Sequence, residues 1–385
     1  MTSFFHGNLK QYLLSKIEEE YSIHQVCGLV GPRQSGKTTL VKSYLNSIEI
    51  PTHFFDCENP LHLARLENPM LTFQELQGLI VIDEVQLRPD LFPVLRVIVD
   101  NNKESKFLVT GSASRDLLNQ SSETLAGRIG YHQVTPFTLE EVKDWKLLWK
   151  RGGFPKSFLA ASNKLSERWR DEYIKTFLER DILKLGFDLT PSIVNKLWRM
   201  LSFMQAQVLN IHHLSQSLGI DHRTVKRYLN ILESAFMITL LRPWHNNSKK
   251  REVKSPKIYI RDSGLLYRLL GLSDEEIEFN PKLGASFEGF VIEEIVRHFN
   301  AYETSYFWAT HSGAELDLLI TNGIRKIGFE IKYTENPKIT KSMNIALNDL
   351  ELEHLYLIIP SNEKFKLSEN ITCLGIENLR FCKDF

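Results

Sequence analysis

Residues Gly31 to Thr38 read GPRQSGKT and match the pattern G-x-x-x-x-G-K-[ST] at every fixed position. An apolar stretch, QVCGLVG, precedes this loop, and a helical pattern, TTLVKSYL, follows it. The glycines let the backbone curl so that its N–H groups face a phosphate at the start of a helix. In such a loop Lys37 reaches the terminal phosphates of a nucleotide and the Thr38 hydroxyl binds Mg²⁺. The stretch therefore predicts a phosphate-binding loop between a strand and a helix.

A second apolar stretch, LIVIDEV at 79–85, ends in two acidic residues. Ligands of open α/β sheets bind beyond the carboxyl ends of the strands. Asp83 is therefore a candidate ligand of Mg²⁺, and Glu84 is the candidate that orients or activates the attacking water, which suits ATP hydrolysis. The predicted nucleotide-binding residues are Gly31, Pro32, Arg33, Gln34, Ser35, Gly36, Lys37, Thr38, Thr39, Asp83 and Thr110.

Two more positions are open to two interpretations each. Thr110, Gly111 and Ser112 follow the apolar part of the stretch KFLVTGSAS. Small polar residues there either sense the γ-phosphate or position the attacking water, and a plain Gly/Ser turn is the alternative. Arg128 in LAGRIG is suited to neutralise charge on a transferred phosphoryl group, in its own site or in that of a neighbouring subunit. A surface arginine between glycines is the alternative.

The first third of the chain alternates strand-like runs with helical patterns, which predicts a parallel α/β sheet. From about Thr138 to Met204 the pattern is helical, and GGFP at 152–155 is a turn signal between helices. Two short helix patterns and an apolar segment follow. A long helix, ASFEGFVIEEIVRHF, then precedes four more strand-like runs, SYFWAT, AELDLLIT, KIGFEIKY and HLYLIIP.

The stretches GPRQSGKTTL, VIDEVQ, LVTGSAS, LAGR, RGGFP, LERDI, KSPKIYIRDSGLL and GASFEGFVIEE occur in this order. The chain resembles the bacterial and archaeal AAA+-like ATPases that carry a DUF4143 C-terminal region. The resemblance implies an α/β chain with a P-loop ATPase core, a winged helix-turn-helix and a C-terminal domain like the PD-(D/E)XK (restriction-endonuclease-like) nucleases. The expected boundaries are 1–137 for the core, 138–205 for a helical lid, 206–275 for the winged helix and 276–385 for the nuclease-like domain.

The stretch NIHHLSQSLGIDHRTVKRYLNILE, at 210–233, reads as a helix, a turn at Gly219 and a second helix starting near Asp221 or His222. Basic residues at the start of such a second helix enter the major groove of DNA, and a basic wing contacts phosphates. The alternative is a module that contacts protein, with its basic residues merely solvated. The candidate nucleic-acid contacts are Arg223, Thr224, Lys226, Arg227, Lys249, Lys250 and Arg251.

The stretch AELDLLITNGIRKIGFEIKY predicts two strands joined by a hairpin turn at Asn322–Gly323. Asp317 lies in the first strand, and Glu330 and Lys332 share one face of the second. Two carboxylates suit Mg²⁺, and a lysine beside them suits the attack of water on a phosphate. The spacing matches the nuclease pattern, although Leu316 replaces its proline. A solvated Glu–Lys pair on a half-exposed strand is the alternative.

The helix upstream offers a further ligand for this Mg²⁺ site. Glu288 is the first candidate to complete the coordination, and Glu293 on the same helix is the alternative. The predicted catalytic residues of the chain are Glu84, Arg128, Asp317, Glu330 and Lys332, and the predicted metal ligands are Thr38, Asp83, Glu288, Asp317 and Glu330.

Composition limits the partners and the compartment. Lys plus Arg and Asp plus Glu both number 47, so a nucleic-acid surface must come from local clustering. The four cysteines lack zinc spacing, no signal peptide is evident at the N-terminus and no apolar run approaches the ~18 residues of a membrane span. We expect a cytoplasmic, ATP-hydrolysing protein that acts on DNA and that forms a homo-oligomer if Arg128 acts between subunits. The alternative is an ATP-driven switch or scaffold whose nuclease-like domain is inert.

Overall fold

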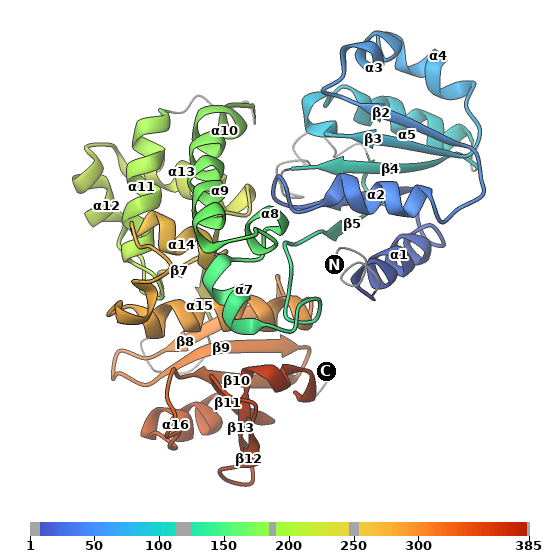
Figure 1. The fold of residues 1–385 in the computed structure, drawn as a ribbon. Coiled ribbons are helices and arrows are strands. Elements are labelled where there is room, and N and C mark those ends of the chain that lie inside the picture. The colour runs from blue at the N-terminus through green and yellow to red at the C-terminus, as the bar shows by residue number, and fades with distance from the viewer. Residues whose placement is uncertain (1–7, 103, 113–124, 185–189, 246–253, 383–385) are drawn as a thin grey trace. The chain divides into compact units, whose positions relative to one another are not determined.

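The structure is a computed structural model that describes residues 8–102, 104–112, 125–184, 190–245 and 254–382. The chain forms two compact units (Figure 1). Unit 1 contains Met1–Val142, Lys175–Leu189 and Asn230–Met237, and unit 2 contains Lys143–Ile174, Thr190–Leu229 and Ile238–Phe385. The predicted domain boundary at 137/138 lies five residues before Val142, where the chain first passes from unit 1 to unit 2. The predicted boundary at 275/276 lies inside unit 2.

Unit 1 is built on a five-stranded sheet in which every pair of neighbours is parallel. Its order is β2-β3-β4-β1-β5, so β4 separates β1 from β3. β1 and β3 are buried along their whole length, as parallel strands covered on both faces must be. The predicted α/β class with a parallel sheet is confirmed. The strands are β1 (Val26–Val30), β2 (Thr52–Asp56), β3 (Leu79–Asp83), β4 (Lys106–Gly111) and β5 (Ile129–Gln133).

Helices cover both faces of this sheet (Figure 1). Ile17, Leu40 and Val41 of α1 and α2 pack in one hydrophobic core, whereas Phe73 and Leu95 of α4 and α5 pack in another. The helical elements of unit 1 are α1 (Asn8–Glu20), α2 (Lys37–Leu45), α3 (Pro60–Arg65), α4 (Pro69–Gln74), η1 (Val85–Leu87), α5 (Leu91–Asn101), the π-helical η3 (Phe177–Asp181) and α10 (Ile182–Lys184).

Unit 2 contains a mixed sheet of eight described strands in the order β12-β13-β11-β10-β9-β8-β6-β7. The antiparallel pair β6–β7, which follows the helix-turn-helix stretch, joins the C-terminal strands through the parallel pair β6–β8. Strands on both sides of the predicted 275/276 boundary therefore share one sheet. The strands are β6 (Ile238–Pro243), β7 (Lys257–Ile260), β8 (Ser305–Ala309), β9 (Glu315–Asn322), β10 (Arg325–Ile331), β11 (His354–Ile359), β12 (Lys364–Lys366) and β13 (Ile371–Gly375).

The helices of unit 2 include most of the stretch that the sequence assigns to a lid. Trp149 of α7 donates from Nε1 to Ser286 Oγ of α15 (3.0 Å), and Trp145 donates to Glu377 Oε1 (3.0 Å). Residues 143–174 thus pack with the C-terminal region. The helical elements are α7 (Trp145–Arg151), α8 (Pro155–Phe158), α9 (Asn163–Thr176), α11 (Pro191–Phe203), α12 (Ile211–Leu218), α13 (His222–Ser234), α14 (Ser263–Leu269), η4 (Ile277–Phe279), α15 (Leu283–His298), α16 (Lys341–Asp349) and η5 (Ile376–Phe381). The last residues of α9 and of α13 belong to unit 1.

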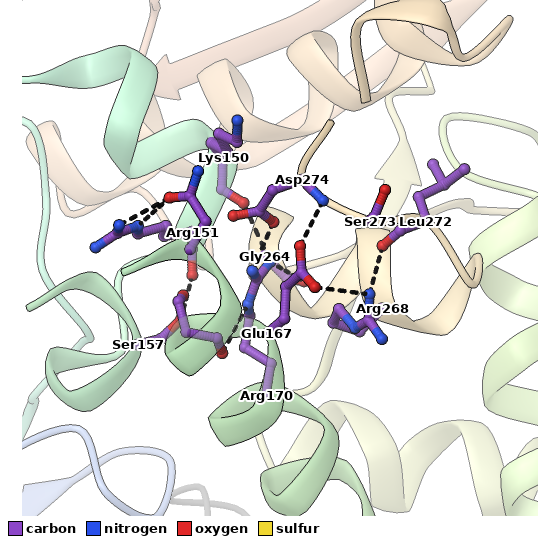
Figure 2. A network of polar contacts seen from close by, with 12 residues as sticks. Lys150, Arg151, Ser157, Glu167, Arg170, Gly264, Arg268, Leu272, Ser273 and Asp274 are labelled. Carbon is purple, nitrogen blue, oxygen red and sulfur yellow. Dashed lines mark hydrogen bonds and ion pairs between the residues drawn. The ribbon is translucent and has the colours of Figure 1, made fainter. Parts of the chain in front are cut away.

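A buried polar network ties α7, α9 and α14 together (Figure 2). The Arg170 side chain is fully buried, and its Nη2 donates to Asp274 Oδ1 at 2.7 Å. Its Nη1 donates to the carbonyl oxygens of Lys150 and Gly264, both at 3.2 Å. One guanidinium therefore satisfies two backbone carbonyls and one carboxylate, and it links α9 both to α7 and to the segment 264–274.

The hairpin β9–β10 differs from its prediction by one position. Asn322 pairs with Arg325, so the two-residue turn is Gly323–Ile324 and not Asn322–Gly323. Gly323 has φ 60°, and a glycine at the first central position is what a type II′ turn requires. In the part of the chain that the structure describes, no helix is both long and apolar enough to cross a bilayer.

Candidate functional site

The phosphate-binding loop has its predicted place between β1 and α2. Gly36 has φ 103°, a left-handed conformation that disfavours a side chain, and α2 begins at the next residue. Lys37 is 4% exposed, and its Nζ donates to the carbonyl oxygens of Gly31 (2.9 Å) and Pro32 (3.0 Å). Burial lowers the pKa of this ammonium group to about 8. The loop thus holds a cation at the start of a helix.

The loop also contains a buried donor that no described residue satisfies. Ser35 Oγ is buried and has no hydrogen-bond partner among the described residues. A buried polar group without a partner is costly, and an anion at a helix N-terminus accepts hydrogen bonds from such donors. Ser35 and Lys37 therefore fit the phosphates of a nucleotide.

Thr38 and Asp83 meet at the carboxyl edge of the sheet. Thr38 Oγ1 donates to Asp83 Oδ2 at 3.0 Å, which brings together the start of α2 and the end of β3. A hydroxyl and a carboxylate oxygen are ligands that Mg²⁺ prefers, so this pair fits the ion.

Thr110, at the end of the intervening strand β4, is fully buried and donates its hydroxyl to Asp83 Oδ1. It also accepts from the backbone N–H of Glu84 at 3.3 Å. A direct contact of Thr110 with the γ-phosphate does not fit this placement, because the hydroxyl is used to orient Asp83.

Glu84 has φ 56°, which is unusual for a residue with a side chain and often marks a functional position. Its carboxylate accepts a hydrogen bond from Gln86 Nε2, which also donates to Ser112 Oγ at 3.0 Å. Gln86 is an orienting residue that the sequence interpretation missed, although it stands inside the quoted stretch VIDEVQ. Glu84 therefore lies directly after the last residue of β3, in a strained backbone conformation, and Gln86 holds its carboxylate.

A cavity of about 600 Å³ borders the phosphate-binding loop within unit 1. Arg33 Nη1 donates to Asp181 Oδ1 of the π-helix η3, and its Nη2 donates to Glu58 Oε1 at 3.3 Å. π-Helical turns occur frequently at functional sites. The sequence interpretation missed Asp181 and Arg180, which belong to the stretch LERDI at 178–182. Asp181 is 148 positions from Arg33, so no local pattern connects the two. The cavity is lined by Arg33, Gln34, Thr176, Glu179, Arg180 and Leu183.

Arg33→Ala is expected to weaken ATP binding about tenfold, or about 1.4 kcal/mol, which is within the range for a charged hydrogen-bonding group. The substitution removes a cation beside the loop and leaves Asp181 without the hydrogen bond from Arg33. Titration with a fluorescent ATP analogue measures the change.

A double-mutant cycle tests whether Asp181 acts through Arg33. If it does, Asp181→Asn changes affinity in the parent chain but not in the Arg33→Ala chain. Additive losses would contradict a coupled pair.

Arg128 lies at the amino ends of the strands, whereas the phosphate-binding loop lies at their carboxyl ends. It precedes β5, whose Ile129 pairs in parallel with Val26 at the start of β1, roughly 16 Å of strand before the loop. Its guanidinium forms a bidentate ion pair with Asp100 at 2.6 and 3.0 Å. A role for Arg128 in its own nucleotide site does not fit this position. A role in a neighbouring subunit stays a prediction.

The helix-turn-helix candidate is formed by α12 and α13. Arg223, Lys226 and Arg227 are exposed on α13, whereas the Thr224 hydroxyl donates to Asp221 Oδ2 (2.7 Å) and is used at the start of the helix. α13 starts at His222, as expected. The wing candidates Lys249, Lys250 and Arg251 lie outside the described residues.

The C-terminal sheet brings Asp317, Glu330 and Lys332 together. Lys332 Nζ lies 2.9 Å from Glu330 Oε1 and 3.9 Å from Asp317 Oδ2. Asp317 Oδ2 also accepts from the backbone N–H of Ile331 at 2.8 Å. Glu330 Oε2 is buried without a hydrogen-bond partner in the described part of the chain. The predicted cross-hairpin grouping is thus present.

Between the two upstream candidates, Glu288 is the one that faces Asp317. Glu293 instead accepts from Arg261 Nε (2.9 Å) and Arg297 Nε (3.1 Å). Glu288 Oε1 accepts from Tyr259 OH at 2.6 Å. Burial, together with the charge of Asp317, raises the pKa of Glu288 well above its usual range.

A lysine that the sequence interpretation missed lies among these carboxylates. Lys257 Nζ pairs with Glu315 and lies 3.4 Å from Glu288 Oε1 and 3.8 Å from Asp317 Oδ1. With Lys257 in place, the residues that the structure describes include no three histidine, cysteine or acidic side chains that are placed to hold a metal ion. With an ammonium group between Glu288 and Asp317, the arrangement does not fit the Mg²⁺ site expected there.

Three families match successive parts of the chain. The AAA domain family matches residues 24–143, the domain of unknown function DUF8612 matches 142–276, and the domain of unknown function DUF4143 matches 283–379. The AAA match covers the phosphate-binding loop, Asp83 and Glu84. The core is therefore of the P-loop AAA ATPase type, and DUF4143 covers most of the C-terminal sheet.

Two solved structures are similar to the chain at low sequence identity. The Walker-type ATPase PABY2304 of Pyrococcus abyssi is 16% identical, with a TM-score of 0.46 over 69% of this chain and 96% of that protein. AMPPCP-bound DnaA from Aquifex aeolicus is 13% identical, with a TM-score of 0.30 over 59% of this chain and 87% of that protein.

Two curated relatives are much closer in sequence. The uncharacterized proteins Rv2008c of Mycobacterium tuberculosis and Mb2031c of Mycobacterium bovis are each 45% identical over 355 residues, which span 91% of this chain and 80% of each relative. The chain therefore belongs to the same family as these two mycobacterial proteins, and it is an AAA-type P-loop ATPase chain with a DUF4143 region.

Proposed function

We propose that the protein binds and hydrolyses ATP in unit 1 and uses this reaction to act on DNA in the cytoplasm. The observation that carries the first half is the grouping of Lys37, Thr38, Asp83 and Glu84 at one edge of the sheet. Lys37 and Thr38 begin the helix that follows the loop, and Asp83 and Glu84 end β3. A cation, a hydroxyl–carboxylate pair of the kind that Mg²⁺ prefers and a further carboxylate thus lie close together, which supports the proposal.

Each residue has a distinct task in hydrolysis. Lys37 exchanges its contacts with backbone carbonyls for contacts with phosphate oxygens and neutralises their charge. Glu84 orients the attacking water and accepts its proton, and Gln86 holds that carboxylate. Thr38 and Asp83 would hold Mg²⁺, which supplies charge neutralisation on the phosphates.

The DNA half of the proposal rests on α12, α13 and the β6–β7 pair, which together have the order of a winged helix. The exposed basic residues Arg223, Lys226 and Arg227 stand on the second helix, the one that enters the major groove in helix-turn-helix proteins. In a chain with equal numbers of basic and acidic residues, this local cluster is the surface that would attract phosphates.

The double substitution Arg223→Ala/Lys226→Ala is expected to weaken DNA binding about tenfold near physiological salt. A plot of log affinity against the logarithm of the salt concentration has a negative slope. Its magnitude is expected to decrease by about 1 for each phosphate that the variant no longer neutralises. Fluorescence anisotropy with a labelled duplex measures both quantities.

The matched control is Lys164→Ala/Arg168→Ala, which removes the same charge from the exposed surface of α9. Equal affinity and equal salt slope in the two double variants would overturn the assignment of α13 to DNA. ATP turnover, measured with and without the same duplex, tests whether the two halves are coupled, and stimulation by DNA is expected.

The second candidate function is an ATP-driven switch whose nuclease-like domain serves assembly or partner binding. The resemblance implies Mg²⁺-dependent cleavage by Asp317, Glu330 and Lys332, but the contact of Lys257 with Glu288 and Asp317 favours an inert domain. Light scattering with and without ATP tests assembly. Nuclease activity that Asp317→Ala abolishes would overturn the proposal of an inert domain.

A further inference from the structure

Lys257 is the first residue of β7 and one of the most buried charged groups in unit 2. It is 4% exposed, and its Nζ lies 5.5 Å from the centre of the Phe307 ring. Three carboxylates surround the ammonium group, and we call Glu288, Glu315 and Asp317 the carboxylate cluster. The cluster brings together α15 and β9, and Lys257 adds β7.

Burying a cation costs several kcal/mol unless it is paired and hydrogen-bonded. Lys257 meets this condition, because its ammonium group is within hydrogen-bond distance of Glu288 and Glu315 and has Asp317 as a third, longer ion pair. Burial alone would lower its pKa, but the charges of Glu288, Asp317 and Glu315 outweigh burial and raise it. The contacts with three carboxylates therefore favour the charged form of Lys257, as the role of a counter-ion requires.

We propose that Lys257 is the resident cation of the carboxylate cluster and occupies the position that a divalent ion would need. The site is then metal-free, and the lysine joins β7 to β9 and α15. This inference does not depend on ATP hydrolysis or on DNA binding, since Lys257 and the carboxylate cluster are not among the residues proposed for those two functions.

Lys332 provides an internal comparison. Its side chain is 47% exposed, and it contacts Glu330 from the open side, with Asp317 Oδ2 at 3.9 Å. Lys257 is enclosed, whereas Lys332 can swing into solvent and leave its carboxylates accessible. Removing Lys257 should therefore open a cation position, but removing Lys332 should not.

Binding of Mn²⁺, followed by electron paramagnetic resonance, tests the proposal on the full chain. All variants carry Asp83→Asn and are studied without nucleotide, which removes the metal site of the phosphate-binding loop. With Lys257 in place, no Mn²⁺ bound through Asp317 is expected up to about 1 mM, the range of weak divalent-ion sites. Adding Lys257→Met is expected to create one bound Mn²⁺ per chain, and adding Asp317→Asn to that variant should remove it.

Lys332→Met in the same background is the matched control and is expected to bind no Mn²⁺. If Lys257→Met is too unstable to purify, the chain that retains Lys257 still decides the question. One Mn²⁺ bound to that chain and lost on Asp317→Asn would overturn the proposal. A folded Lys257→Met variant that gains no Mn²⁺ would overturn it as well.

Discussion

Lys37→Ala is expected to lower ATP turnover by about 10²–10³-fold, the usual cost of removing one group that stabilises charge in a transition state. The ammonium group is buried in the loop and held by two carbonyl oxygens at 2.9 and 3.0 Å, so it lies beside the proposed phosphate site and can exchange these contacts for phosphate oxygens. Alanine removes the charge and leaves the loop backbone in place. A phosphate-release assay at saturating ATP measures the change.

Lys42→Ala is the matched control, because Lys42 is an exposed lysine on the same helix, α2. Its turnover should equal that of the parent chain. The circular dichroism spectrum of Lys37→Ala should also be unchanged, since alanine favours the helical conformation that α2 has from this residue on. Turnover of the Lys37→Ala protein close to the parent rate would contradict the assignment of the loop.

Arg170→Met is expected to lower the free energy of unfolding of unit 2 by about 3–5 kcal/mol, because it leaves a buried carboxylate without its cation. Asp274 is 2% exposed, and its Oδ2 has no hydrogen-bond partner among the described residues. The substitution also frees the carbonyl oxygens of Lys150 and Gly264. Urea unfolding measures the effect, and tryptophan fluorescence reports on unit 2 because Trp145, Trp149, Trp169, Trp198, Trp244 and Trp308 all lie in it.

Arg168→Met is the control for this prediction, since the Arg168 side chain stands on the same helix and is 77% exposed. Its effect should stay within about 0.5 kcal/mol. Adding Asp274→Leu to Arg170→Met should recover much of the stability, because replacing a whole buried pair by apolar groups costs less than breaking it. A loss below about 1 kcal/mol for Arg170→Met would show that the ion pair is dispensable.

The phosphate-binding loop and the parallel sheet were predictable because their signals are local. Gly36, Lys37 and Thr38 are neighbours in the sequence, and the backbone of one strand–loop–helix passage fixes how they face a ligand. The hairpin that pairs β9 with β10 follows in the same way from alternating side chains around Gly323, although its turn is shifted by one residue. The grouping of Asp317 with Glu330 therefore came from the sequence as well.

Tertiary contacts decided the roles that sequence spacing left open. The sequence makes Arg128 a candidate for the nucleotide site. The parallel pairing of β5 with β1 places it instead at the amino ends of the strands, away from the phosphate-binding loop at their carboxyl ends. Asp181 reaches Arg33 across 148 positions, and Lys257 reaches Glu288 across 31. No local pattern marks such partners, since only the folded chain brings them within reach.

The sequence by itself determined the class of the core, the loop that holds phosphate and the order of the segments, because periodicity and short motifs act over a few residues. The tertiary structure alone decided which charges neutralise one another. The free energy of a buried charge depends on the partners and the dielectric around it, and these exist only once distant strands and helices have packed. Lys257 shows the consequence, since an unremarkable lysine in the sequence becomes the cation among Glu288, Glu315 and Asp317 in the fold.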